Sequence, residues 1–141
     1  MSFELTKLHD HYVGGLVLPG LEPGSTGQQS ELLAFTEDRI RARGVGEVLV
    51  VYICHPEVGW NAVVGSRCEG LSELTIGDSL VRVPAGYFAR FVPDGEHSDP
   101  VDDVWHQVEI AEKEGLIERA HREEVAVIGP SGLTELYISL A

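Results

Sequence analysis

The segment from Glu47 to His55, with the sequence EVLVVYICH, constrains the fold of this chain more than any other. Its apolar residues occupy both odd and even positions, which is typical of a strand that is buried on both faces. Such a strand lies in the middle of a sheet. Turn-forming residues at 56–59 and an apolar run at 60–67 follow directly, and they predict an antiparallel hairpin.

The residues before this hairpin predict one strand and one helix. Residues 11–18 form an apolar run in which Gly14 and Gly15 indicate a bulge or a bend. Residues 30–43 place apolar side chains on one helical face, and Gly44 ends the pattern. The first part of the chain is therefore expected to run strand, helix, strand, strand.

The same order of elements follows in the second part. Residues 79–92 predict a strand that is interrupted at 84–86, where a proline and a glycine break the ladder. A helix begins at Pro100 with Asp99 as its cap and ends at Gly115. A second hairpin joins strands at 124–128 and 134–140 through a turn at 129–132.

The repeated order of elements predicts how the chain is organised. Its 141 residues are expected to form one α+β domain, 1–141, from two duplicated β-α-β-β units at about 1–77 and 78–141. A pseudo-twofold axis would relate the units. We expect an antiparallel sheet with both helices on one face and a ligand groove between the halves.

The net charge of the chain limits the classes of molecule that it is expected to bind. Ten Lys and Arg against 23 Asp and Glu give a net charge of −13, which disfavours direct binding to nucleic acid and attracts cations. Solubility, or a salty habitat, is the alternative explanation of that charge. No apolar run approaches the ~20 residues of a membrane span, and the first ten residues lack the pattern of a secretory signal. We therefore expect a soluble cytoplasmic protein.

Four features, namely the run VPAGYFARF at 83–91, Trp105 and the segments at 55–65 and 121–140, together resemble the bacterial effector-binding family called GyrI-like. The run VPAGYFARF at 83–91 resembles the family's "iPaGxYAxF" strand, with Phe88 in the position of the family's tyrosine. Trp105 lies where the family usually carries a helix tryptophan. The segment at 55–65 is similar to the family's turn and following strand, and the segment at 121–140 is similar to its closing hairpin.

This resemblance implies a duplicated β-α-β-β fold with a ligand groove. Relatives bind bulky aromatic or cationic drugs as sensor domains of regulators or as free-standing proteins. Others modulate gyrase, and some similar proteins are hydrolases that open strained rings. The family's key acid falls on Glu124, whereas Glu123 and Ala126 replace aromatic residues of the motif. No helix-turn-helix pattern precedes the domain, so a free-standing form is expected.

The closing hairpin supplies an independent argument for Glu124. A turn centred on Pro130 and Ser131 places Glu124 opposite Tyr137 on one face of the sheet, and Val125 belongs to the other face. A partly buried carboxylate beside a tyrosine could select a cationic guest. The alternative is a solvent-exposed face on which Glu124 is a surface acid, and the family resemblance favours the groove.

The other predicted ligand contacts are aromatic, because aromatic faces bind flat or cationic molecules. Core packing is the alternative for Trp105 and Phe88. The candidate walls are Trp60, Trp105, Tyr87, Phe88 and Tyr137.

Other chemistries find little support in the sequence. His9 and His11 lack a third ligand, so no metal is predicted, and Cys54 with His55 is not interpreted as a nucleophilic pair. Cys54 and Cys68 would not meet in the first hairpin, so both are expected to be free thiols. No phosphate-binding loop or other cofactor motif is present.

The sequence therefore predicts a free-standing binding protein for small amphipathic aromatic or cationic compounds. Glu124 would supply the charge and the aromatic residues would supply the walls. The first alternative is a hydrolase of strained, cyclopropane-type electrophiles with Glu124 as general acid or base, and the second is a protein that modulates DNA gyrase or a regulator. Binding is favoured over catalysis, no cofactor is expected, and the oligomeric state stays open.

Overall fold

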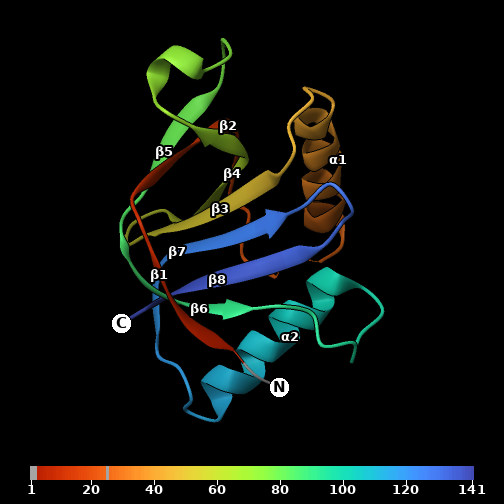
Figure 1. The fold of residues 1–141 in the computed structure, drawn as a ribbon, viewed down its shortest axis with the longest axis vertical. Coiled ribbons are helices and arrows are strands. Elements are labelled where there is room, and N and C mark those ends of the chain that lie inside the picture. The colour runs from red at the N-terminus through yellow and green to blue at the C-terminus, as the bar shows by residue number, and fades with distance from the viewer. Residues whose placement is uncertain (1–2, 25) are drawn as a thin grey trace.

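Eight strands and two helices form in the part of the chain that the computed structural model describes, residues 3–24 and 26–141 (Figure 1). The elements are β1 (Glu4–Leu8), β2 (His11–Pro19), α1 (Gln28–Arg41), β3 (Val48–His55), β4 (Gly59–Cys68), β5 (Ser79–Val83), β6 (Gly86–Phe91), α2 (Pro100–Lys113), β7 (Arg119–Ile128) and β8 (Thr134–Leu140), with a short 3-10 turn at Leu71–Glu73. Within the described residues, no helix is long and apolar enough to cross a membrane.

All strands join one antiparallel sheet with the order β1-β6-β8-β7-β3-β4-β2-β5. The order reads equivalently from both ends, because β2-α1-β3-β4 corresponds to β6-α2-β7-β8 and β1 corresponds to β5. The pseudo-twofold axis passes between β3 and β7. The expected α+β fold with duplicated β-α-β-β units is confirmed.

The two halves exchange their edge strands. β1 pairs with β6 of the second half, and β5 pairs with β2 of the first half. Only two residues separate β1 from β2, yet six strand spacings, about 29 Å in a flat sheet, lie between them. A link of that length reaches roughly 10 Å. The sheet must therefore curl strongly, and Figure 1 shows β1 crossing in front of the central strands.

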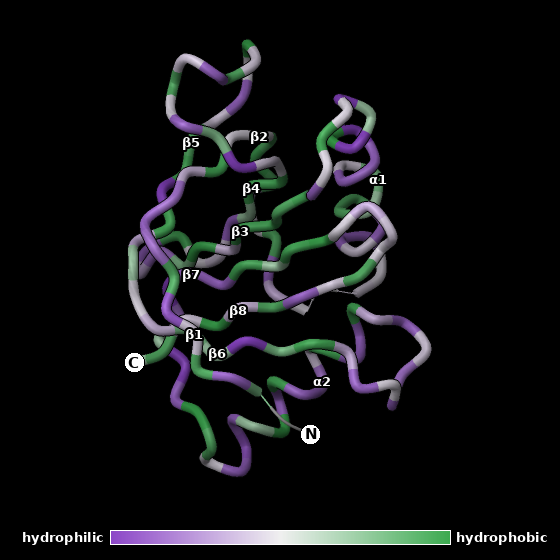
Figure 2. The backbone as a smooth tube through the Cα atoms, in the orientation of Figure 1, coloured by the Kyte–Doolittle hydropathy of each residue, from purple (hydrophilic) through white to green (hydrophobic). Residues whose placement is uncertain are grey.

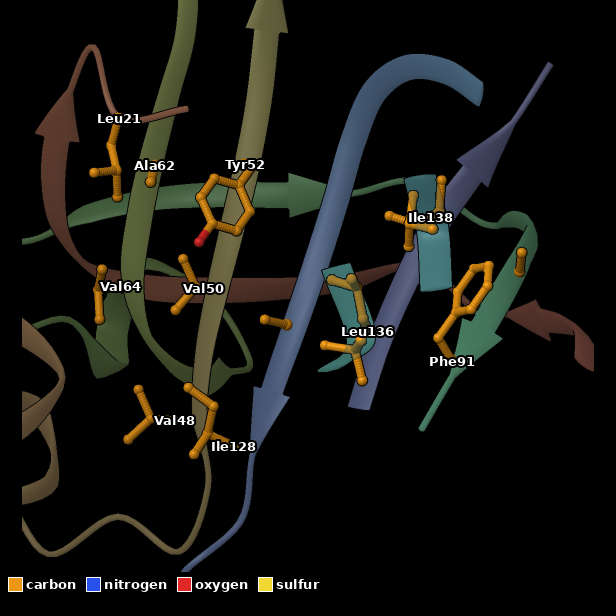
Figure 3. Packing of buried hydrophobic residues seen from close by; sticks show 14 of the residues in the cluster. Leu21, Val48, Val50, Tyr52, Ala62, Val64, Phe91, Ile128, Leu136 and Ile138 are labelled. Atoms are coloured by element: carbon orange, nitrogen blue, oxygen red, sulfur yellow. The ribbon is translucent and has the colours of Figure 1, made fainter. Parts of the chain in front are cut away.

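The curl gives the sheet a core on each face. Residues of α1 and α2, including Ile40 and Val108, pack with Val50 and Ile138 on one face. Val13, Leu49, Val51, Val83, Phe88, Val125 and Val127 form a second core on the other face. Figure 2 shows hydrophobic colouring along the central strand β3, and Figure 3 shows Val48, Val50 and Tyr52 following one another on it. The double burial predicted for this strand is thus explained by helices on one side and the curled sheet on the other.

The start of α2 agrees with the sequence prediction. Asp99 accepts a hydrogen bond of 2.8 Å from the backbone N–H of Val101, and Pro100 occupies the first helical position. Two other elements differ from the prediction. β1 was not predicted, and β7 begins at Arg119 rather than Glu124.

The register of the closing hairpin also differs from the prediction. Glu124 pairs with Ile138, and Tyr137 pairs with Val125, so the predicted pairing of Glu124 with Tyr137 is wrong. The loop has five residues, 129–133, because the backbone N–H of Gly129 bonds to the carbonyl of Leu133. One extra loop residue shifts the pairing by one position, and Tyr137 consequently lies on the opposite face from Glu124.

Glycines in β2 and β4 allow a close approach of two backbones. Gly15 and Gly65 are directly paired, and a Cβ at Gly65 would overlap the carbonyl oxygen of Gly14. The ladder between β2 and β4 runs through Gly14 and Gly15 without a register shift, so no bulge occurs there. Cys54 and Cys68 are free thiols.

Candidate functional site

A cavity of about 170 Å³ lies between α1 and α2, above the helix-covered face of the sheet. The central strands β3, β7 and β8 form its floor, and the two helices form its walls. Its lining residues are Gly24, Ser30, Leu33, Ala34, Glu37, Val50, Tyr52, Asp99, Val101, Asp102, Val104, Trp105, Ala126, Ile128, Thr134 and Leu136. The cavity therefore sits at the junction of the two halves, where a groove was expected.

The charged residues that line this cavity are all acidic. Glu37 projects from α1, and Asp99 and Asp102 lie at the start of α2. Glu37 is half-buried, and desolvation raises its pKa to about 7, with a smaller upward contribution from Asp38 and an opposing one from Arg41. A cation that entered the cavity would favour the charged form of this carboxyl group.

Two aromatic residues stand side by side in the cavity. The rings of Tyr52 and Trp105 meet edge to face, with centroids 5.8 Å apart and an interplanar angle of 82°. Tyr52 is 3% exposed, and its hydroxyl forms no hydrogen bond with any described residue. Burial raises the pKa of this phenol, and the nearby Glu37 and Glu124 raise it further. The neutral hydroxyl is thus available to a guest in the cavity.

A buried carboxylate fixes the loop that precedes α2. Asp103 is 1% exposed and accepts hydrogen bonds from the backbone N–H groups of Asp94 and Gly95 at 3.1 and 2.9 Å. Gln107 adds a bond of 2.8 Å from Nε2. Burial alone would raise the pKa of Asp103, but these hydrogen bonds lower it to about 2. The charged Asp103 therefore holds the N-terminal end of α2, which carries one wall of the cavity.

Glu124 lies on the helix-covered face but does not line the cavity. It pairs with Tyr52 across β3 and β7, and its side chain is 0% exposed. Its carboxylate accepts two hydrogen bonds from Arg119, one of 2.8 Å from Nε to Oε2 and a second from the guanidinium to Oε1. Arg119 also reaches Glu112 on α2 at 3.4 Å. An arginine of this chain thus occupies the place that the sequence argument gave to a cationic guest.

A β-bulge makes this ion pair possible. In a regular strand, residues five positions apart such as Arg119 and Glu124 point to opposite faces. The ladder with β8 shifts register between these two residues, and His121 adopts a positive φ of 55°. The irregular backbone brings both side chains to the same side.

The predicted aromatic contacts are dispersed, and only Trp105 lines the cavity. Trp60 is partly buried against the helix-side core, and its ring centroid lies 6.5 Å from that of His121. Phe88 is 3% exposed and belongs to the core on the opposite face.

The two predicted tyrosines also lie away from the cavity. Tyr137 packs at the edge of the core on the opposite face and donates a hydrogen bond of 2.9 Å to Glu135. Tyr87 is 63% exposed, and the ammonium group of Lys7 lies 6.0 Å from its ring centre. The structure therefore does not bring Glu124, Tyr137, Tyr87 and Phe88 together in one pocket.

Three residues of the site escaped the sequence argument. Glu37 lies in a helix whose other acids are exposed to solvent. The one signal that could have identified it is its position next to Thr36, which is on the buried face of the helix. Tyr52 stands in an apolar strand and looked like core. Arg119 lies in a charged segment that resembles a solvated connection, and its pairing depends on a bulge that the sequence does not announce.

Metal binding has no evident location among the residues described. No group of three or more His, Cys, Asp or Glu side chains in residues 3–24 and 26–141 is placed to hold a metal ion. The acids at the cavity, Glu37 and the two aspartates of α2, lie among aromatic and apolar lining residues.

Comparisons with known proteins establish the fold. The sequence matches no family model and no curated protein. Among solved structures, SAV2435 bound to tetraphenylphosphonium has a TM-score of 0.72 at 11% identity, covering 100% of this chain and 94% of that chain. An integron cassette protein from the mobile metagenome of Vibrio cholerae has a TM-score of 0.73 at 15% identity, covering 100% and 97%.

A third solved structure comes from Staphylococcus aureus MU50 and is a candidate bacterial transcription regulation protein. Its TM-score is 0.68 at 12% identity, covering 99% of this chain and 98% of that chain. At such low identities, these similarities establish a common fold along the whole chain and leave the function to be argued from the site.

Proposed function

We propose that this protein binds lipophilic organic cations in the cavity between α1 and α2, as a member of the GyrI-like effector-binding group. The observation that carries the proposal is the lining of the cavity. Three carboxylates surround apolar and aromatic walls, and no Lys, Arg or His is among the lining residues. Such a lining attracts positive charge and excludes anions.

The aromatic pair gives the site a second means of recognition. A flat or spherical aromatic cation can stack against Trp105, and the hydroxyl of Tyr52 can bond a polar group of the guest. SAV2435, which shares this fold, was solved with tetraphenylphosphonium, a bulky aromatic cation. That likeness supports the class of ligand, and tetraphenylphosphonium is therefore a suitable first probe.

We favour binding over hydrolysis because of the state of Glu124. A general acid needs a proton to donate and access to the leaving group. The carboxylate of Glu124 is fully buried and accepts two hydrogen bonds from Arg119, so a leaving group has no direct access to it. For a gyrase-modulating role, the other alternative, the lining of the cavity provides no support.

The test compares two probes of equal shape and opposite charge. Tetraphenylphosphonium and tetraphenylborate are titrated separately into the full chain, with heat and tryptophan fluorescence as readouts. A Trp60→Phe variant assigns the fluorescence change to Trp105. We expect the cation to bind and to change Trp105 emission, and the anion to bind about tenfold more weakly or not at all. Equal affinity for both ions, or no binding of the cation, would contradict the proposal.

A further inference from the structure

The cavity between the helices is small for the ligands proposed above. Its volume of about 170 Å³ falls below the roughly 300 Å³ at which sites for drug-sized ligands begin. A guest as large as tetraphenylphosphonium therefore needs more space than the cavity offers. The cavity can become larger only if a side chain next to it moves.

Strand β7, which contributes to the floor of the cavity, continues past it to Glu124. Ala126 lines the cavity on β7, and Glu124 is the next residue of that strand on the same face. Tyr52, directly opposite Glu124, lines the cavity from β3. A guest that passes the ring of Tyr52 would therefore meet the carboxylate of Glu124.

The group that covers this carboxylate is itself a cation. Among the described residues, Arg119 alone is hydrogen-bonded to the carboxylate of Glu124, through two nitrogen atoms. A fully buried carboxylate needs such a partner, because an uncompensated charge in the interior is strongly unfavourable. Any positive group that replaced the guanidinium would satisfy the same requirement.

Arg119 has a route away from Glu124. Its side chain is 14% exposed, whereas that of Glu124 is not exposed at all, so the arginine lies between the buried carboxylate and the solvent. Its NH1 already contacts Glu112, whose side chain is 40% exposed. A displaced guanidinium could therefore keep one carboxylate partner at the surface while it releases the other.

An aromatic side chain lies beside the same region. Trp60 packs against the helix-side core, and its ring meets that of His121 edge to face. His121 in turn lies 3.7 Å from Glu112, the second partner of Arg119. A guest in the space of the guanidinium would thus have a carboxylate beneath it and an indole nearby.

We propose that Arg119 is an internal competitor for organic cations, and that a bulky cation binds by displacing its guanidinium from Glu124 toward Glu112. The space over Glu124 is then the second compartment of the groove, joined to the cavity past Tyr52. This inference rests on the proposed function and adds the residue that sets which cations bind. Small cations fit the first cavity and leave Arg119 in place, and bulky ones need both compartments.

The first test removes the competitor. Arg119→Met keeps much of the side-chain volume and deletes the charge, and Arg122→Met on the same strand is the matched control at an exposed position. We expect Arg119→Met to bind tetraphenylphosphonium about tenfold more tightly than the wild type, and Arg122→Met to be unchanged. The double variant Arg119→Met/Glu124→Gln should lose this gain, because its second compartment carries no charge.

A measurement on the unaltered protein covers the case in which Arg119→Met does not fold. The side-chain Nε–H signal of Arg119 is followed by NMR while tetraphenylphosphonium is added, and tetramethylammonium serves as the small cation. We expect the bulky cation to shift this signal and accelerate its exchange with water, and the small cation to leave it unchanged.

The outcomes separate this inference from the proposed function. One outcome is that tetraphenylphosphonium binds the wild type while the Nε–H of Arg119 keeps its chemical shift and its slow exchange with water. In that case the arginine is not displaced and the inference is overturned, whereas the proposed cation site is still supported. An affinity of Arg119→Met equal to that of the wild type also overturns it. If Arg119→Met binds the cation and the wild type does not, the role of Arg119 as a competitor is supported. The cation-binding function proposed above for the wild type is then contradicted.

Discussion

At Glu37, the proposed binding of a cation is coupled to the loss of a proton. Its pKa is raised to about 7, so at neutral pH a large fraction of this carboxyl group is protonated. A cation in the cavity favours the carboxylate, and binding should therefore release protons. We expect the affinity for tetraphenylphosphonium to rise as the pH increases from about 5 to 8 and to level off above. Calorimetry in buffers of different ionisation enthalpy would measure the released protons.

Substitution of Glu37 checks the origin of this pH dependence. Glu37→Gln should weaken tetraphenylphosphonium binding by about 1–2 kcal/mol and abolish most of the rise with pH. The matched control is Glu31→Gln on the exposed side of the same helix, which should change neither quantity. The folded protein itself should become less stable as the pH rises through 7, because the raised pKa means that the native state binds the proton more tightly. An unaltered pH profile in Glu37→Gln would exclude Glu37 as the responsible group.

Gly65 is required by a close contact between two backbones. A Cβ at this position would overlap the carbonyl oxygen of Gly14, and neither backbone can move without disturbing the ladder between β2 and β4. We expect Gly65→Ala to destabilise the fold by about 1–3 kcal/mol, as overpacking typically does. Gly46→Ala is the control, since a Cβ there would meet nothing within 4 Å. Urea denaturation of both variants would reveal the difference, and equal stabilities would refute this explanation.

The sequence could predict the kind of residue in the site better than its location. It favoured acids and aromatic residues, and among the aromatic candidates Trp105 lines the cavity. It placed Glu124 beside Tyr137 because a four-residue turn was assumed, and the real loop contains Leu133 as a fifth residue. Such a choice depends on backbone hydrogen bonds in the turn, and the residue types GPSGL permit either form.

At the scale of elements, α2 was predictable because its signals are local. Asp99 and Pro100 mark its start within two residues, and the apolar stripe gives its length. β1 was not predictable in this way. Its five residues, ELTKL, alternate weakly and form an edge strand whose partner, β6, lies some eighty residues away.

Asp103 links α2 to the loop before it, and this link should be visible in stability. Asp103→Asn keeps the size but loses the charge that several backbone N–H groups and Gln107 bond. We expect a loss of about 2–3 kcal/mol, the scale of hydrogen bonds to a charged group. Glu109→Gln on the exposed side of α2 is the control.

The lowered pKa of Asp103 predicts an acid transition with a defined sign. Its pKa is about 2 in the folded protein and near 4 in an unfolded chain, so the carboxylate contributes stability above pH 4. That contribution is lost as the pH falls from about 4 to 2. Thermal unfolding between pH 2 and 5 should show a smaller acid dependence in Asp103→Asn than in the wild type, and identical curves would contradict the assignment.

At the scale of the whole molecule, the duplication was visible in the order of elements, whereas the exchange of edge strands was not. Each half has the order strand, helix, strand, strand, and this order alone predicts that strands pair with other strands of the same half. The actual ladders join β1 to β6 and β5 to β2, across the halves. Such long-range pairing has no local signal, because it depends on how strongly the sheet curls.

The exchange makes a specific prediction about fragments. Residues 1–77 contain β1 to β4 but lack every partner of β1, the partner β5 of β2, and the partner β7 of β3. A central strand that is buried on both faces would become an exposed, apolar edge, so this fragment should be unfolded or aggregate. Residues 78–141 lose the same partners by symmetry.

Because three ladders join the halves, a mixture of the two fragments should recover the dispersed amide spectrum of the intact protein. A dispersed NMR spectrum from residues 1–77 alone would mean that each half folds independently and that the exchanged strands are accessory. A mixture that stays unfolded would mean that the covalent link at 77–78 is essential for assembly.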